Sequence, residues 1–113
     1  MTTTFDLPYL SLGPDTDEIS LFRQARQSLE LQKWTEAREL LLQLATRSPT
    51  TTRYRALLAY ARGQESLEAG DEIRAREEWR RALILDPMLE DARRMLAVRA
   101  KQRSWVDRLL GRA

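Results

Sequence analysis

The chain has 113 residues and a formal net charge of +2, and it contains neither His nor Cys. The usual zinc sites need thiolate or imidazole ligands, and a nucleophilic Ser or Cys needs a His base, so those chemistries are excluded. A disulfide is excluded as well. We therefore expect no enzymatic activity, no catalytic residues, no bound metal and no cofactor.

The composition favours helices. Ala, Leu, Glu, Gln and Arg are abundant, whereas Gly and Pro number only 4 each. There is no stretch of about 18 apolar residues, which a membrane-spanning helix requires. Residues 1–12 lack the basic start and apolar block of a secretory signal. The sequence therefore predicts an all-α, cytoplasmic protein.

The N-terminal segment, residues 1–14, is expected to be irregular because two prolines and a glycine interrupt any helix. Its apolar side chains leave two roles open, which are packing on the domain and occupying a binding groove. A first helix is predicted from Asp15, with Glu18 three residues later to complete a capping box. Apolar residues then recur at helical spacing to about Gln32.

Four further helices are predicted from apolar spacing and from the turn residues between them. They cover about 35–47, a start within 50–52 to about 69, 72–85, and 87 to about 103. Pro49 and Gly70 are predicted to end the second and third helices. Asp71 is expected to cap the fourth helix, and Asp86 with Pro87 to open the fifth.

Residues 104–113 are predicted to form a basic amphipathic tail, with Ser104 capping a last short turn. The apolar members of this tail are candidates for self-association or for weak, peripheral membrane contact: Trp105, Leu109 and Leu110. Packing of the tail back onto the fifth helix is the other alternative. Nucleic-acid binding is not expected, because acidic residues flank the paired arginines along the chain.

The two halves of the chain are related by a shift of 38 residues. The shift pairs Ser28-Leu29-Glu30 with Ser66-Leu67-Glu68, Ala37-Arg38-Glu39 with Ala75-Arg76-Glu77, and Pro49 with Pro87. Similar residues are also paired: Ile19 with Leu57, Phe22 with Tyr60, Ala25 with Gly63, and Leu41 with Trp79. A duplicated helical pair is typical of solenoid proteins, in which each unit buries its apolar face against the next.

The second unit, about 56–89, resembles the tetratricopeptide repeat. Gly63 falls where that family places a small residue between two helices, and Gly70-Asp71 falls at its inter-helix turn. Its small-large-small series on the second helix is matched by Ala75, Trp79 and Ala82. The first unit, about 18–51, keeps part of the pattern, and the spacing of 38 exceeds the family's usual length of about 34.

The resemblance implies a right-handed α-solenoid of two antiparallel helical hairpins within a domain of residues 15–103, closed by a capping helix over about 87–103. It also implies a concave groove that binds a partner. The groove positions carried over from the family are Ile19, Phe22, Arg26, Leu29, Leu57, Tyr60, Gln64, Leu67, Arg94 and Val98. Phe22 and Tyr60 are the best candidates for binding hot spots, although both can equally fill the seam between hairpins.

This pattern favours a non-enzymatic, bacterial-type adaptor or chaperone-like module that binds a peptide or helix of another protein. The expected ligand has an apolar anchor beside an acidic residue. The alternative is a self-assembling structural subunit that forms homo-oligomers through its end faces, with Leu42, Trp105 and Leu110 in the contact. A third hypothesis places residues 1–14 in the groove of their own chain.

Overall fold

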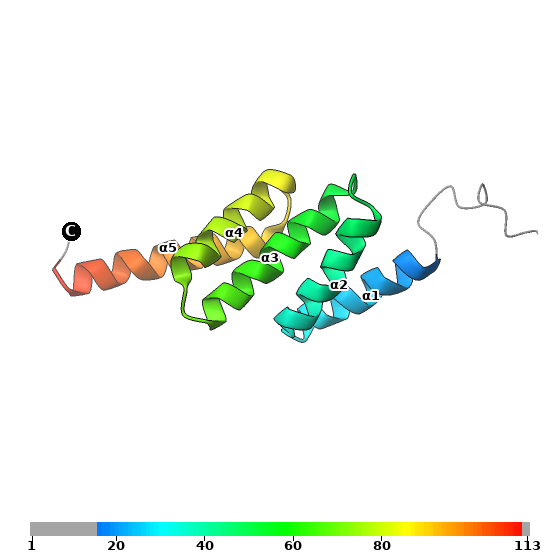
Figure 1. The fold of residues 1–113 in the computed structure, drawn as a ribbon. Coiled ribbons are helices and arrows are strands. Elements are labelled where there is room, and N and C mark those ends of the chain that lie inside the picture. Colours follow the sequence, from blue (N-terminus) through cyan, green and yellow to red (C-terminus); the bar gives the residue numbers. More distant parts are fainter. Residues whose placement is uncertain (1–15, 112–113) are drawn as a thin grey trace, which may run out of the picture.

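The computed structural model describes residues 16–111, and this part of the chain forms five α-helices and no strand (Figure 1). The helices are α1 (Thr16–Glu30), α2 (Trp34–Arg47), α3 (Thr52–Glu68), α4 (Glu72–Leu85) and α5 (Glu90–Leu109). The all-α prediction is confirmed. The expectations for residues 1–14 and for the Asp15 cap fall outside the described residues. Glu18, the other half of that capping box, accepts a 2.6 Å hydrogen bond from the Tyr54 hydroxyl and so joins α1 to α3.

The turns from α1 to α2 and from α3 to α4 have the same construction. Each contains one residue with positive φ, which is Gln32 at 59° in the first turn and Gly70 at 84° in the second. The hydrogen bonds that close these turns run from Lys33 N–H to the Ser28 carbonyl and from Asp71 N–H to the Ser66 carbonyl, both at 2.9 Å. This is the Schellman arrangement, which satisfies carbonyl groups left free at a helix end. The turn geometry therefore repeats at the spacing of 38 residues that relates the two halves of the sequence.

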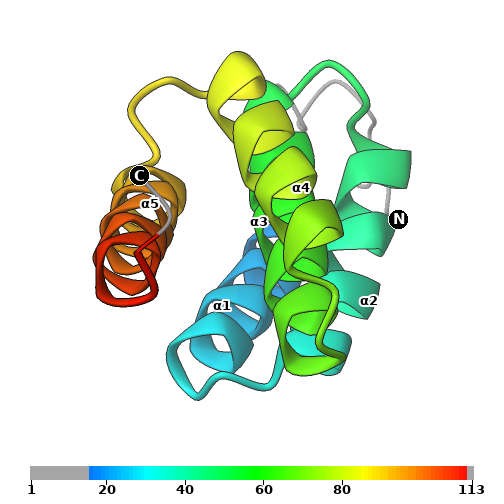
Figure 2. The ribbon, with the colours of Figure 1, turned by 90° about the vertical axis from the view of Figure 1, so that its left-hand side faces the viewer.

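The buried positions repeat at the same spacing. Four pairs of equivalent residues are buried in both units: Ala25 and Gly63, Ala37 and Ala75, Leu41 and Trp79, Leu44 and Ala82. Each helix packs against the next one along the chain, and α1 and α5 lie on the same side of α3 (Figure 2). The central helix α3 is covered on several sides and has nine buried residues, whereas α5 has Ala92 alone.

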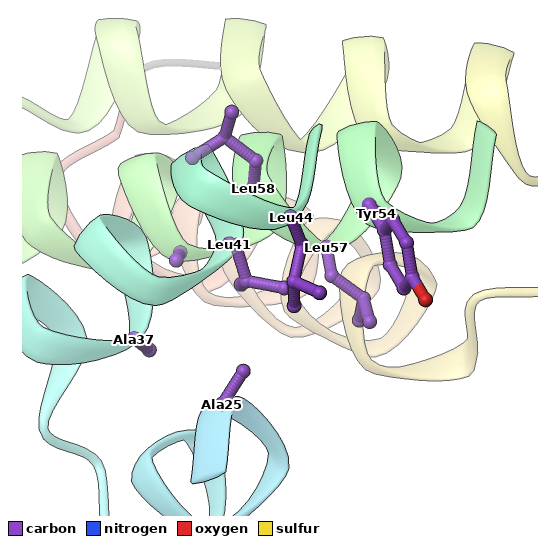
Figure 3. Packing of buried hydrophobic residues seen from close by; sticks show 8 residues of the cluster. Ala25, Ala37, Leu41, Leu44, Tyr54, Leu57 and Leu58 are labelled. Carbon is purple, nitrogen blue, oxygen red and sulfur yellow. The ribbon is translucent and has the colours of Figure 1, made fainter. Parts of the chain in front are cut away.

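Two hydrophobic clusters form the interior. The first cluster joins α1, α2 and α3, and Figure 3 shows Leu41, Leu44 and Leu57 gathered within it. The second cluster joins α3, α4 and α5 around Trp79, which is fully buried. Leu29 and Leu89 pack against both clusters, so they connect the two parts of the core.

The predicted start of the fifth helix at Pro87 is wrong, since α5 begins at Glu90 with Leu89 as its N-cap. Asp86 instead ends α4, and its carboxylate accepts a 3.1 Å hydrogen bond from the Met88 N–H. An Asp side chain that bonds the backbone two residues ahead forms a turn in place of a helix start. By contrast, Asp71 caps α4 as predicted and accepts a 3.1 Å bond from the backbone of Arg74.

The predicted break at Ser104 is also wrong. The helix α5 runs without interruption to Leu109, so the first part of the predicted tail continues this helix. Ser is only weakly unfavourable inside a helix, and the residues that follow Ser104 all tolerate helical geometry. The chain leaves helical geometry at Gly111, which has a φ of 75°.

Candidate functional site

A hollow of about 680 Å³ lies on the side of the molecule that α1, α3 and the first turn of α5 share (Figure 2). Its apolar lining includes Leu29, Trp34, Leu57 and Tyr60. Its charged lining consists of Arg26, Glu30, Arg53, Asp86, Asp91 and Arg94. The hollow thus combines an apolar floor with charged edges, which is the usual composition of a polypeptide-binding groove.

The hollow contains five of the ten predicted groove residues, namely Arg26, Leu29, Leu57, Tyr60 and Arg94. The other five do not line it. Ile19 and Val98 are exposed outside it, whereas Phe22 and Leu67 pack against the core. Gln64 is only 7 % exposed, and its Oε1 has no hydrogen-bond partner among the described residues.

The two proposed hot-spot aromatics have different places. The Phe22 ring packs against the first cluster, with its centroid 5.4 Å from that of Tyr54. Tyr60 is only 8 % exposed and meets the edge of Trp34 at 5.9 Å, so that it forms the floor of the hollow. Burial raises the pKa of Tyr60 to about 12, with the charge of Asp91 as a second cause. Phe22 therefore fills the seam, whereas Tyr60 both packs and lines the hollow.

Two guanidinium groups sit against the Phe22 ring. The Cζ atom of Arg26 is 5.8 Å from the ring centroid, and that of Arg53 is 5.2 Å away. Both distances fall within the range of cation–π contacts, which hold a guanidinium in place without neutralising it. Neither arginine has an ion pair with a described residue, whereas Arg94 in the same hollow pairs with Asp91 at 3.1 Å.

The charges are therefore distributed unevenly around the hollow. On the α5 side, the Asp91 carboxylate is paired with Arg94, and the Asp86 carboxylate accepts a backbone N–H. On the α1 and α3 side, Arg26 and Arg53 remain free to bind an anion. Arginine donors form charge-assisted hydrogen bonds with carboxylates, which are about twice as strong as neutral ones. The geometry suits an apolar side chain on the floor and a carboxylate at this edge.

Sequence reasoning missed Arg53 and Trp34 as parts of the site. Arg53 precedes Leu57 by four residues and Tyr60 by seven, so it lies on the same face of α3. That spacing is a signal from which Arg53 could have been found. Trp34 belongs to α2, and its place in the hollow follows from the packing of its ring against Tyr60.

Two further hollows, of about 730 and about 720 Å³, lie between α4 and the C-terminal half of α5. Glu72 joins the two helices there, because it accepts a 2.9 Å hydrogen bond from Arg99 and pairs with Arg76 at 3.5 Å. The hydrogen bond from Arg99 is the largest cause of the lowered pKa of Glu72. These arginines are already engaged within the protein. The hollow beside Arg26 and Arg53 is therefore the better candidate for a ligand.

Among residues 16–111, no group of Asp and Glu side chains is placed so that it could hold a metal ion. None of the five described helices combines the length and the apolar character that crossing a bilayer requires. Comparisons of the chain with protein-family models, with curated proteins and with solved structures returned no match.

Proposed function

We propose that this chain is a non-enzymatic, adaptor or chaperone-like module that binds a peptide or helix of another protein in the hollow between α1, α3 and α5. The observation that carries the proposal is the pair of unneutralised guanidinium groups, Arg26 and Arg53, beside an apolar floor. A partner segment with an apolar residue next to Asp or Glu would satisfy both features. Apolar anchors and arginine contacts of this kind dominate the energetics of protein interfaces.

We further propose that the fold is a short solenoid of the tetratricopeptide type, with α1–α2 and α3–α4 as antiparallel hairpins and α5 as the cap. The equivalent turns and equivalent buried positions at a spacing of 38 residues support this arrangement. Gly63 supports it too, because a Cβ atom there would lie 2.6 Å from Trp79 Cδ1 and 3.1 Å from the Ala75 carbonyl oxygen. Such close approach between paired helices is the role that the resemblance assigns to this glycine.

Charge reversal on two helices tests the binding proposal. The variant Arg26→Glu with Arg53→Glu changes the two free guanidinium groups of the hollow. Its matched control is Arg23→Glu with Arg55→Glu, which makes the same charge change at exposed arginines of the same two helices, outside the hollow. Tagged proteins are used to recover partners from the native host, and helical content is compared by circular dichroism.

Loss of two charge-assisted contacts, each worth about 1.5–3 kcal/mol, is expected to lower partner recovery by more than about tenfold. The control is expected to recover the partner as the unaltered protein does. Equal recovery by the folded hollow variant and the control would reject the hollow as the binding site.

A second candidate function is self-assembly, and it rests on α5. Trp105, Leu109 and Leu110 are all exposed on the last turns of this helix. Exposed apolar groups close together are typical of interaction surfaces. Light scattering tests this candidate, because a strict monomer at high concentration would eliminate a homo-oligomer.

A further inference from the structure

The C-terminal half of α5 extends past α4 and away from the body of the protein (Figure 1). Three large apolar side chains on this half are open to solvent. Val98 is 51 % exposed, Trp105 is 56 % exposed and Leu109 is 67 % exposed. A solvent-facing helix normally carries polar residues at such positions. This half of α5 is therefore available for contact with another molecule.

The exposed apolar residues form one line along the helix. Gln102, Trp105 and Leu109 follow Val98 at intervals of four, seven and eleven residues, which is the spacing of a coiled-coil seam. Ala92 and Leu96 pack against the second cluster and lie on a different face of the helix. We call the line of Val98, Gln102, Trp105 and Leu109 the α5 stripe. The packing of α5 onto the core leaves this stripe uncovered.

The charges around the α5 stripe have one predominant sign. Residues 98–109 contain four basic residues and one acidic residue. Lys101 and Arg108 are exposed and lie along one border of the stripe, three residues after Val98 and Trp105 respectively. Arg99, on the other side, is held by Glu72 of α4 at 2.9 Å. An occupant that matches these borders carries acidic residues beside its own apolar seam.

We propose that the α5 stripe docks an acidic amphipathic helix of a partner protein, with which α5 forms a short two-helix coiled coil. A second copy of this chain fits less well, because two such stripes would bring the Lys101 and Arg108 borders of both copies together. Like charges at the borders of a coiled coil disfavour pairing, and opposite charges select the partner. This site is separate from the hollow, and it goes beyond the function proposed above.

The test uses designed peptides as probes and the full chain as receptor. The acidic probe is a fluorescein-labelled peptide of about three heptads, with Leu at the seam positions and Glu at the border positions. The control probe is identical except that Lys replaces Glu at the borders. Binding is measured by fluorescence anisotropy at two salt concentrations. We expect the acidic probe to bind about tenfold or more tighter than the basic probe, and to weaken as salt is raised.

Substitutions then locate the probe. Trp105→Glu should weaken binding of the acidic probe by about tenfold or more, whereas Ile84→Glu, the same change at an exposed apolar residue of α4, should leave it unchanged. Equal affinity for the two probes, or no effect of Trp105→Glu, would overturn the proposal. So would a dimer of the full chain that Trp105→Glu dissociates. The Arg26→Glu and Arg53→Glu double variant should keep its affinity, because a probe lost from that variant alone would lie in the hollow.

Discussion

The two helix pairs fill one equivalent position with different combinations of side chains. In α1–α2 the buried pair is Ala25 and Leu41, and in α3–α4 it is Gly63 and Trp79. The larger indole is accommodated because the facing residue has no Cβ, and the Trp79 ring lies directly against Gly63. Protein interiors are close-packed, so a change of volume on one helix requires an opposite change on its neighbour. The two units therefore share a shape and differ in how they fill it.

The largest expected effect is loss of this filling in the second unit. Trp79→Ala should lower the free energy of unfolding by about 3–5 kcal/mol, because it leaves a cavity at a fully buried site. Leu41→Ala should cost about 3 kcal/mol in the first unit, since it removes fewer atoms. Urea denaturation followed by circular dichroism measures both values. A smaller loss for Trp79→Ala than for Leu41→Ala would contradict the equivalence of the two positions.

A volume exchange tests the same equivalence more sharply. Gly63→Ala should cost about 1–3 kcal/mol, because the added methyl group clashes with the Trp79 ring. In the double variant Gly63→Ala with Trp79→Leu, the second unit acquires the pair found in the first, and the clash is removed. We expect the double variant to be more stable than the sum of the single effects predicts. Strict additivity in denaturant unfolding would show that the two side chains do not share one space.

The two turns provide a third comparison. Gly70 has a φ of 84° with open space around it, so a side chain at this position meets no atom and costs only backbone strain. Gly70→Gln should lower stability by about 1–2 kcal/mol. Gln32 already bears that strain at the equivalent position, with a φ of 59°, so Gln32→Gly should stabilise the protein by less than about 1 kcal/mol. Thermal unfolding of the two variants gives both signs, and a loss of stability from Gln32→Gly would contradict the comparison.

The smallest effect concerns one tyrosine in each cluster. Burial is the main cause that raises the pKa values of Tyr54 and Tyr60 from 10.0 to about 12, and the hydrogen bond to Glu18 adds to the shift at Tyr54. Folding favours the protonated phenols, so their contribution to stability is complete below pH 10 and is lost as the pH rises toward about 12. Absorbance titration of phenolate, with Tyr54→Phe and Tyr60→Phe as controls, measures both values. Titration of either tyrosine near pH 10 in the folded protein would contradict its burial.

The helices were predictable where local chemistry decides their ends, and the errors arose where two local signals compete. Asp71 and Asp86 both precede a helical pattern, yet only Asp71 caps one, because the Asp86 carboxylate bonds the N–H of Met88 in a turn. Ser104 is a potential cap whose flanking residues continue a helix equally well. Sequence patterns do not show which of two feasible local hydrogen bonds forms.

The site was predictable in part for a different reason. Arg26, Leu57 and Tyr60 follow from the repeat pattern, because equivalent helices expose equivalent faces. Arg53 acquires its role from the Phe22 ring of another helix, and this contact depends on how α1 and α3 pack. Contacts between distant segments are set by the assembled core, which single-sequence periodicity does not describe.

The most direct test of the central claim is photo-cross-linking in the native host from inside and outside the hollow. A benzophenone amino acid replaces Glu30, which lines the hollow, or Glu39, an exposed residue of α2 outside it. Binding of a partner polypeptide between α1, α3 and α5 predicts an adduct of defined mass from position 30 and none from position 39. Adducts from position 39 alone, or the same adducts from both positions, would contradict the proposal that the hollow holds the partner.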